Sequence, residues 1–318
     1  MIDMKIYGVD VSHHQGVINW KDMASELRRV NIDTDPGFAI LRVGYSKKAG
    51  GLTLDKQIKN NISGCEQHGV PMGAYYYSYD KTPEAATATA NDVVDFIDGH
   101  EWDYPIYIDV EYEAFNTGKD GSGRSREKVK ADNTAIIKAA LKVFEDAGYY
   151  AAVYCSRDFF LNYTNLSELK AFDKWEAAYG SIDTDAVQNG LWQFSSKNAL
   201  KIKGFGNALD CDVSYVDYPL IMRSKGLNGY DLGMVKNESV TSTKLSKNLK
   251  WVGVVTATSL NVRTWAGIWN DTCFFSPLQR GEKVFVCDTV KDKSGDDWYY
   301  IKCNGHFGFV HASYVKKA

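Results

Sequence analysis

The sequence predicts an α/β protein, an incomplete TIM-like (β/α)5β3 barrel followed by a small all-β barrel. Three observations support this prediction. Short apolar segments alternate with helical patterns, polar residues interrupt this alternation after residue 220, and many aromatic residues and turn signals follow residue 250. The expected boundaries are therefore 1–220 for the first domain, 221–250 for a linker and 251–318 for the second domain.

The first domain is expected to contain about eight strands. They lie at residues 5–11, 38–43, 72–78, 105–111, 150–155, 174–178, 191–194 and 209–215. Helical patterns separate the early strands, at residues 20–30, 55–68, 83–98 and 128–147. Because the helices shorten after the fifth strand, the barrel should end in three closely spaced strands, and repeated βα units predict a parallel sheet.

The last part of the chain differs in composition. Residues 221–250 are rich in Ser, Thr, Lys, Asn and Gly, as is typical of a flexible linker. The small module after it is unusually aromatic, so some rings should be exposed to a ligand. The aromatic residues include Trp265, Trp269, Phe274, Phe275, Trp298, Tyr299, Tyr300, Phe307, Phe309 and Tyr314.

The net charge of −3 is unevenly distributed. Residues 1–220 carry 23 Lys and Arg against 32 Asp and Glu, residues 221–250 carry 6 against 2, and residues 251–318 carry 8 against 6. A basic tail on an acidic body suggests that the tail meets an anionic surface, but its charge is too dilute to indicate nucleic acid. No apolar run is long enough to span a membrane, so no membrane partner is expected.

The N-terminus and the cysteines indicate where the protein is made. Residues 1–5 show no basic segment followed by a long apolar core, so no secretory signal peptide is expected. The 6 cysteines form no C-x-x-C pair, which argues against a zinc ribbon, and free thiols in a reducing cytoplasm are expected. The histidines show no H-x-x-x-H spacing, so neither a metal nor another cofactor is expected.

Acidic residues end several of the expected strands. Asp109 and Glu111 share one face of a strand because side chains alternate. Asp10 ends the first strand, and Asp210 lies in the last. Carboxyl ends of parallel strands meet at one mouth of an α/β barrel, so these acids should form one site. Neighbouring acids raise each other's pKa, which suits a proton donor; a buried pair neutralised by Arg or Lys is the alternative.

Three motifs resemble glycoside hydrolase family 25, the Chalaropsis-type lysozymes of phage endolysins and bacterial autolysins. They are residues 8–16 (GVDVSHHQG), residues 107–111 (YIDVE), and residues 192–194 (WQF) followed by residues 209–212 (LDCD). This similarity spans roughly residues 5–218. The tail resembles a bacterial Src-homology-3 (SH3) module, through residues 259–263 (SLNVR), 280–284 (RGEKV) and 308–310 (GFV).

The resemblance implies hydrolysis of the β-1,4 bond between N-acetylmuramic acid and N-acetylglucosamine in peptidoglycan, and a tail that binds the bacterial cell wall. Glu111 matches the general acid, with Asp109, Asp10 and Asp210 as the other site carboxylates. The family's usual V-D-L-N-like string is LDCD here, so either Asp210 or Asp212 could line the pocket. Together with the expected lack of a signal peptide, the resemblance suggests a phage endolysin that is made in the cytoplasm of a Gram-positive host and released through a holin-type pore. A bacterial autolysin that is exported by another route is the alternative.

The mechanism is expected to be substrate-assisted. The side-by-side pair Asp109 and Glu111 fits neither the retaining nor the inverting arrangement of two carboxylates around a glycosidic bond. By analogy with other D-x-E hydrolases of acetamido sugars, the 2-acetamido oxygen of the substrate would attack the anomeric carbon. Asp109 would orient the acetamido group, and Glu111 would protonate the leaving oxygen. Retention and inversion both stay open.

Further side chains are expected to contact the sugar. They are Arg42, Tyr75, Tyr77, Trp175, Trp192, Gln193 and Asp212. Tyr75 and Tyr77 share a strand face and could stack on sugar rings. Trp175 and Trp192 could wall the cleft, and Arg42 could pair with a site acid or contact the substrate. The glycine-rich loop at residues 112–126 follows the general acid and is a further candidate for substrate contact.

Two other functions fit parts of the sequence. The first is a non-catalytic protein that binds the cell wall through a barrel that has lost its activity. The complete set of acids argues against this function. A metal-dependent amidase or deacetylase is the other, because His13 and His14 lie close to Asp10 in the sequence. The histidine spacing argues against this reading, and a role in shaping the loop or binding sugar is expected for both histidines.

Overall fold

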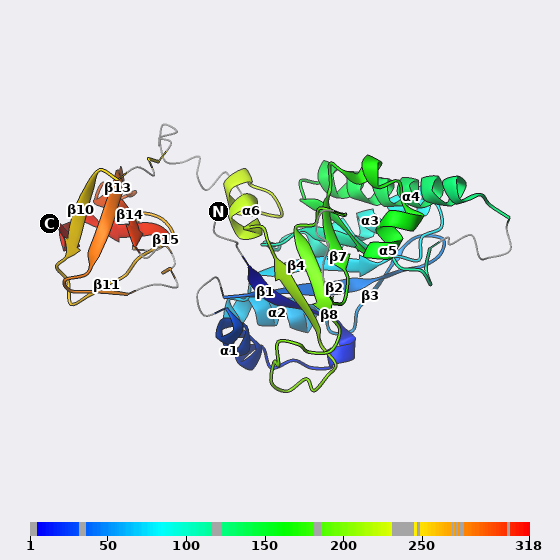
Figure 1. The fold of residues 1–318 in the computed structure, drawn as a ribbon, viewed down its shortest axis with the longest axis horizontal. Coiled ribbons are helices and arrows are strands. Elements are labelled where there is room, and N and C mark those ends of the chain that lie inside the picture. Colours follow the sequence, from blue (N-terminus) through cyan, green and yellow to red (C-terminus); the bar gives the residue numbers. More distant parts are fainter. Residues whose placement is uncertain are drawn as a thin grey trace. The chain divides into compact units, whose positions relative to one another are not determined.

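The computed structural model describes the chain except residues 1–4, 32–35, 116–122, 181–185, 231–244, 247–248, 269, 271, 274–276 and 304–305 (Figure 1). Much of the glycine-rich loop expected to contact substrate therefore lies outside the described residues. The chain divides into two compact units, Met1–Leu232 and Gly233–Ala318.

The first unit contains a closed barrel. Among the described residues its strands are β1 (Ile6–Val11), β2 (Phe38–Ser46), β4 (Met72–Tyr77), β5 (Ile106–Asp109), β6 (Ala151–Ser156), β7 (Asp173–Ala177), β8 (Leu191–Ser195) and β9 (Asp210–Ser214). Strands β1 to β8 pair in parallel along this order. Strand β9 is antiparallel to both β8 and β1 and closes the barrel. A short strand, β3 (Leu52–Leu54), forms a hairpin with β2.

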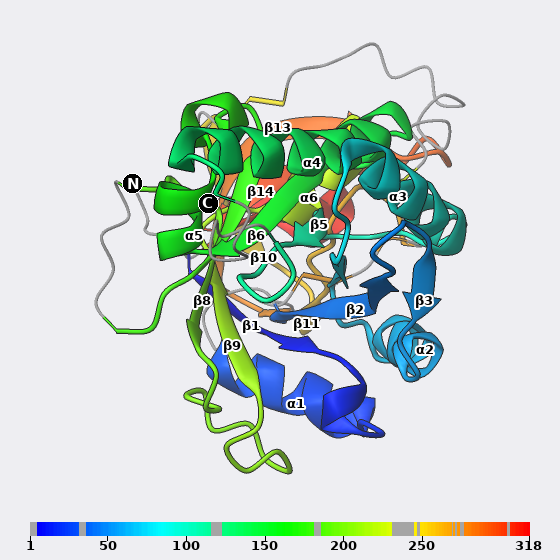
Figure 2. The same ribbon diagram turned by 90° about the vertical axis from the view of Figure 1, so that its right-hand side faces the viewer.

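Helices follow the first five barrel strands. They are α1 (Trp20–Val30), α2 (Ile58–His68), α3 (Pro83–Ile97), α4 (Arg126–Asp146) and α5 (Arg157–Tyr163), and α1 to α4 lie outside the sheet (Figure 2). Side chains of Asn19, Thr82 and Ser125 accept hydrogen bonds from the first turns of α1, α3 and α4, which fixes where these helices begin. The predicted (β/α)5β3 order is confirmed.

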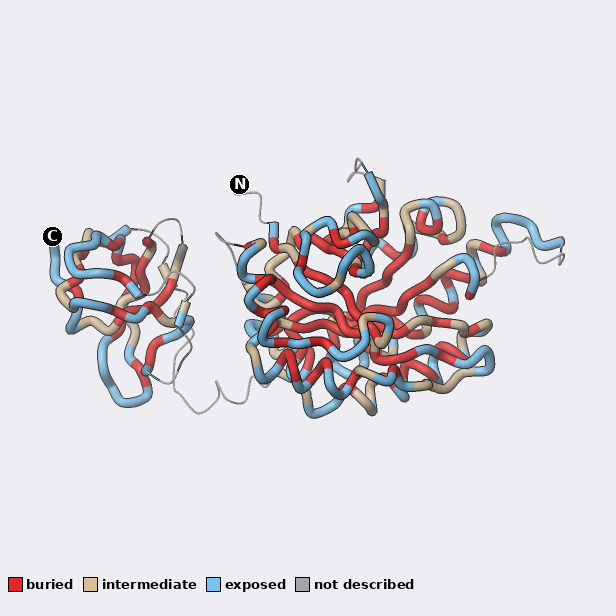
Figure 3. The backbone as a smooth tube through the Cα atoms, turned by 90° about the horizontal axis from the view of Figure 1, so that it is seen from below, coloured by how far each residue is buried: buried red, intermediate tan, exposed pale blue. Residues whose placement is uncertain are grey.

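Strand alternation creates two apolar cores. Outward side chains such as Val9 and Ile108 join the core that underlies the helices. Inward side chains such as Ile40, Tyr107 and Trp175 fill the barrel interior. Figure 3 shows the buried strands surrounded by the more exposed helices and loops. None of the helices in the described residues has the length and hydropathy that crossing a membrane requires.

Helix α6 (Tyr218–Lys225) and the turn after it close the barrel end opposite the carboxyl ends of its parallel strands. Tyr218 and Met222 belong to the barrel core. Asn228 is fully buried and hydrogen-bonds backbone groups of Trp102 and Tyr104. Residues 221–230, which the sequence assigned to a linker, therefore pack as part of the first unit. The linker's residues 231–244 and 247–248 lie outside the described part.

The second unit is all-β, as predicted. Its main antiparallel sheet has the order β15 (His306–His311), β14 (Asp297–Cys303), β13 (Lys283–Lys291), β10 (Trp251–Val255) and β16 (Val315–Lys317), and β11 (Ser259–Leu260) pairs with β12 (Leu278–Gln279). Trp265 and Tyr314 are 42% and 48% exposed, whereas Trp298 and Phe309 are buried. Trp269, Phe274 and Phe275 lie outside the described residues. Cys65, Cys155, Cys211, Cys287 and Cys303 are free thiols.

Candidate active site

The acids expected from the sequence meet at the mouth of the barrel. Asp10 on β1 lies directly opposite Asp210 on β9, and Asp109 ends β5 two residues before Glu111. The expectation that Asp210 belongs to a parallel strand is wrong, because β9 runs antiparallel to both neighbours. Asp210 instead reaches the mouth as the first residue of its strand. Asp212 shares its face of β9 and lies deeper in the barrel.

Burial controls the protonation of these acids. It is the largest cause that raises the pKa of Asp109 well above its ordinary value, and the charges of Glu111 and Asp10 raise it further. Burial also raises the pKa of Asp10 well above its ordinary value, as does the charge of Asp210. The pKa of Glu111 is raised by its partial burial, and then by neighbouring acids including Asp210. Glu111 therefore keeps its proton to a higher pH than an exposed glutamate does.

A cavity of about 300 Å³ adjoins the acids. Its lining includes Asp10, Asp210, Arg42, Tyr75 and His14. This lining distinguishes the two acids of β9, Asp210 and Asp212. Asp210 faces the cavity, whereas the Asp212 side chain is buried beneath it and accepts a hydrogen bond from Trp175 Nε1 (2.8 Å).

Gln193 points into the barrel and holds Asp10. Its Nε2 donates to Asp10 Oδ2 (2.8 Å), and its Oε1 accepts hydrogen bonds from the hydroxyls of Tyr154 and Tyr179 (both 3.0 Å). The sequence predicted that Gln193 contacts the sugar. In the structure Gln193 contacts Asp10, one of the acids of the site. Tyr179, which is 60% exposed, escaped the sequence analysis because it lies in no motif.

The structure does not place the two expected tryptophans at the cavity. Trp175 is buried below it and packs edge-on against Tyr75 and Tyr154, with ring centroids 5.7 and 4.6 Å apart. Trp192 lies on the outer face of β8, and its Nε1 donates to the backbone of Ala178 (2.7 Å). Because side chains alternate along a strand, Trp192 cannot share the inward face of its neighbour Gln193.

Tyr75 and Tyr77, the two tyrosines expected to contact the sugar, lie next to different acids of the site. Tyr75 lines the cavity and is buried except for a small exposed part. Tyr77 is half-buried, packs against Tyr79 with ring centroids 4.9 Å apart, and has its pKa raised by burial and then by the charges of Glu111 and Asp109. Tyr75 thus adjoins Asp10 and Asp210, and Tyr77 adjoins the D-x-E pair.

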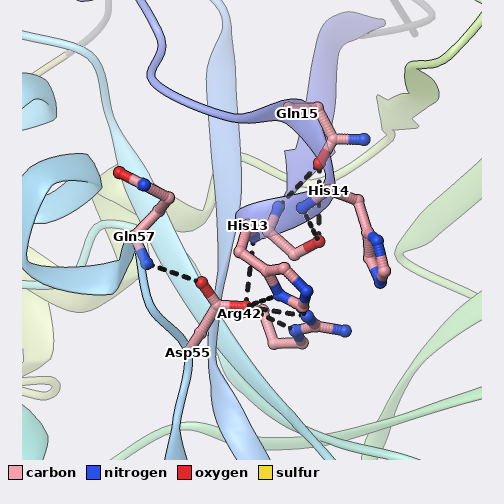
Figure 4. A network of polar contacts seen from close by, with 7 residues as sticks. His13, His14, Gln15, Arg42, Asp55 and Gln57 are labelled. Carbon is pink, nitrogen blue, oxygen red and sulfur yellow. Dashed lines mark hydrogen bonds and ion pairs between the residues drawn. The ribbon is translucent and has the colours of Figure 1, made fainter.

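A second polar network, missed in the sequence, lies beside the cavity (Figure 4). Nε and Nη2 of Arg42 both donate to Oδ2 of Asp55, at 2.9 and 2.8 Å. Asp55 also accepts from the backbone N–H of His13 (3.1 Å) and of Gln57 (2.9 Å). In the sequence, Asp55 is only the first residue of the helical pattern at 55–68. Its contact with Arg42 across the β2–β3 hairpin could not be predicted from that pattern.

The two histidines that could suggest a metal site have other partners in the structure. Across the described residues, no group of three or more His, Cys, Asp or Glu side chains is arranged to hold a metal ion. His13 and His14 stack on each other with ring centroids 4.2 Å apart. His13 Nδ1 lies 2.8 Å from Asp55 Oδ2, so the histidine next to the acids is engaged by a carboxylate.

Asp212→Asn should change how stability depends on pH. Burial, and then the charge of Asp10, raises the pKa of Asp212 well above its ordinary value in the folded protein. Such a group stabilises the fold below its ordinary pKa and loses that contribution as the pH rises through the folded-state pKa. The variant should therefore gain stability relative to wild type as the pH rises from about 4. Asparagine keeps an oxygen for the Trp175 Nε1 hydrogen bond.

Urea unfolding of both proteins at several pH values measures this difference. Asp95→Asn, on the exposed side of α3, is the matched control. A stability difference between Asp212→Asn and wild type that stays constant across this pH range would contradict the prediction.

Each of the two units matches the model of a known protein family. The model of glycosyl hydrolases family 25 matches residues 9–203, and that of a variant SH3 domain matches residues 277–318. The modular autolysin LytC of Streptococcus pneumoniae is 27% identical with a TM-score of 0.53, over 66% of this chain and 46% of LytC. This chain thus spans about half the length of LytC. No curated protein matches the chain.

Two further solved structures share the fold. The spore cortex lytic enzyme SleM of Clostridium perfringens is 16% identical with a TM-score of 0.53, over 99% of this chain and 98% of SleM. The lysozyme of Streptomyces coelicolor is 20% identical with a TM-score of 0.50, over 65% of this chain and 90% of the lysozyme.

Proposed function

Because the chain belongs to the glycosyl hydrolases of family 25, we propose that it is a lysozyme that cleaves the β-1,4 bond between N-acetylmuramic acid and N-acetylglucosamine. The observation that carries this proposal is the half-buried Glu111 beside the buried Asp109 at the mouth of the barrel. The raised pKa of Glu111 supports its role as the general acid that protonates the leaving oxygen. Asp10 and Asp210 line the adjoining cavity.

Asp109 supports a substrate-assisted route within this proposal. Its Oδ1 is buried and has no hydrogen-bond partner among the described residues. A buried acceptor without a partner is costly, and the N–H of a 2-acetamido group would satisfy it. Asp109 would thereby orient the acetamido oxygen toward the anomeric carbon while Glu111 donates its proton. The product of the first turnover would then keep the anomeric configuration.

Product analysis tests the proposal. Purified peptidoglycan is digested with the full chain, reduced with borohydride and examined by mass spectrometry. Reduced N-acetylmuramic acid at the new ends is the expected result. Reduced N-acetylglucosamine would assign the other glycosidic bond, and an intact glycan would overturn the glycosidase. Digestion in EDTA separates a metal-dependent amidase or deacetylase, because the proposed route should be insensitive to the chelator.

The second unit is proposed to bind the cell wall. The match to an SH3 domain and the exposed rings of Trp265 and Tyr314 support this role. The structure of LytC, which is similar to this chain, has been determined in complex with a synthetic peptidoglycan ligand. Peptidoglycan is thus the proposed partner of both units.

We place this activity in a phage endolysin that acts on a Gram-positive host. The pairing of a family 25 barrel with an SH3 unit in one chain supports enzyme action at a thick cell wall. The chain would be made in the host cytoplasm and reach the wall through a holin-type pore. Expression in a Gram-positive cell, alone and together with a holin, tests this setting. Lysis that requires the holin is expected, whereas lysis by the chain alone would contradict it.

A further inference from the structure

Glu111 lies at the point where the barrel sheet stops fixing the backbone. The carbonyl of Asp109 accepts from the N–H of Ser78 (2.9 Å), and the N–H of Val110 donates to the carbonyl of Tyr154 (3.0 Å). Glu111 follows these sheet bonds, just beyond the end of β5. The position of its carboxyl group therefore depends on the turn that comes after it.

The far end of this turn is closed by three contacts. The carbonyl of Glu111 accepts from the N–H groups of Ala114 (3.2 Å) and Phe115 (3.0 Å). Both Ala114 and Phe115 are buried in the apolar core that underlies the helices. Nζ of Lys81, which lies between β4 and α3, donates to the carbonyl of Ala114. The far end is thus held from inside the unit.

The near end of the turn is held by Tyr112. Its hydroxyl donates to Oδ2 of Asp158 on α5 (2.5 Å) and accepts from the hydroxyl of Ser156 at the end of β6 (3.2 Å). Hydrogen bonds to a carboxylate are shorter and stronger than neutral ones. The Tyr112 ring packs edge-on against Phe159 and Tyr163, with ring centroids 5.4 and 5.6 Å apart. Polar and apolar contacts together tie Tyr112 to α5.

The two partners of the Tyr112 hydroxyl are themselves fixed. Oδ1 of Asp158 accepts from Nδ2 of Asn162 one turn along α5 (2.6 Å). Oγ of Ser156 caps the same helix by accepting from the backbone N–H of Phe159 (3.2 Å). The hydroxyl therefore meets a preformed site at the start of α5.

We propose that Tyr112 is a positioning residue, which holds Glu111 at the barrel mouth through its hydrogen bond to Asp158. This inference rests on the proposed function, in which Glu111 is the general acid. Tyr112 acts through the backbone that it shares with its neighbour, and Asp158 acts through Tyr112. Because a general acid works only within hydrogen-bond reach of the leaving oxygen, a small displacement of the turn lowers the rate.

The pH profile provides a readout of this position. Burial is the largest cause that raises the pKa of Glu111. A looser turn admits water to the carboxyl group and lowers that pKa. Since the general acid must carry its proton, the basic limb of the kcat profile would then move to lower pH.

The titratable groups that face Glu111 all remain in Tyr112→Phe. They are Asp109, Glu113, Asp210, Tyr77, Tyr154 and Cys155. A shift of the basic limb in this variant therefore reports a change in the surroundings of the carboxyl group, and not the loss of a neighbouring charge.

The kinetic test uses Tyr112→Phe, Asp158→Ala and the double variant of the full chain. Phenylalanine keeps the ring contacts and removes only the hydroxyl. Each single variant should lower kcat about three- to ten-fold, change KM less than about two-fold and move the basic limb to lower pH. The double variant should match Tyr112→Phe alone, because Asp158 acts through Tyr112.

Tyr163→Phe is the matched control. Tyr163 packs against the Tyr112 ring and stacks on Phe159, with ring centroids 5.3 Å apart for the stacked pair. Its hydroxyl has no hydrogen-bond partner in the part of the chain that the structure describes. The control thus removes a hydroxyl from the same aromatic cluster and should keep the wild-type kcat and pH profile. Equal losses in Tyr163→Phe, additive losses in the double variant, or an unshifted basic limb in Tyr112→Phe would overturn the positioning role.

A measurement without turnover separates this inference from the proposed function. In the NMR spectrum of the full chain, the carboxyl carbon of Glu111 should titrate at lower pH in Tyr112→Phe than in wild type and in Tyr163→Phe. If wild type leaves peptidoglycan intact, the proposed function fails, while this titration still decides whether Tyr112 holds the carboxyl group in place. Identical titrations in wild type and Tyr112→Phe would overturn the inference.

Discussion

Glu111→Gln should lower kcat on peptidoglycan by about a hundred- to ten-thousand-fold, the usual contribution of a general acid. Glutamine has almost the same shape but has no proton of suitable acidity for the leaving oxygen. Glu111 lies just beyond β5, half-buried and next to other acids, so the substitution also removes a group whose charge is unfavourable there. The variant should therefore fold at least as stably as the wild type.

Three measurements make this prediction specific. Turbidity clearing of purified cell walls gives the rate, thermal unfolding gives the stability, and sedimentation with cell walls gives the binding. The exposed Glu145 on α4 provides the matched control, Glu145→Gln, which should retain full activity. A Glu111→Gln variant that clears walls at the wild-type rate would show that another group is the acid. If wild type and variant bind walls equally and neither clears them, the chain is a binding protein.

Asn228→Ala should reduce the free energy of unfolding of the first unit by about 4 kcal/mol. Nδ2 of Asn228 donates to the carbonyls of Trp102 and Tyr104 (3.1 and 2.8 Å), and Oδ1 accepts from the N–H of Tyr150 (2.6 Å). The substitution leaves these buried backbone groups unsatisfied, at a cost of about 1 to 3 kcal/mol for each group that finds no water. Asn228 also has φ +58°, where alanine is disfavoured by about 1 kcal/mol.

Urea unfolding, followed through the fluorescence of the barrel tryptophans, measures this loss. Asn91→Ala on α3 is the control, because the exposed Asn91 makes one hydrogen bond within its own helix (2.8 Å). The control should change stability by less than about 0.5 kcal/mol. An Asn228→Ala variant as stable as this control would show that residues 221–230 behave as the linker that their composition indicates.

Local patterns in the sequence predicted the barrel well because its strands are short apolar runs and its helices have clear caps. The D-x-E pair was visible because two residues so close in sequence need no tertiary information, although β5 ends at Asp109 and Glu111 lies just beyond it. Asp55 and Tyr179 were missed because their partners, Arg42 and Gln193, come from other strands. The direction of the strand that carries Asp210 was also invisible, since an apolar run reads alike in both directions.

Composition is a poor guide to structure where a few residues carry the packing. Residues 221–230 look polar, yet Met222 enters the barrel core and Asn228 is fully buried. Trp192 looked like a sugar platform because it is aromatic and lies in a motif, but the alternation of β8 turns it outward. In both cases the structure depends on the orientation of single side chains, which composition does not reveal.

The pairing of β1 with β9 has a consequence for when the protein becomes active. Asp10 and Asp210 come from the first and last strands of the barrel, and they become neighbours only when those strands join. A nascent chain must therefore emerge from the ribosome as far as β9 before the two acids can share a site. Contacts so distant in sequence form slowly. Catalytic competence is consequently gained late in folding, and incomplete chains that lack β9 should be inactive.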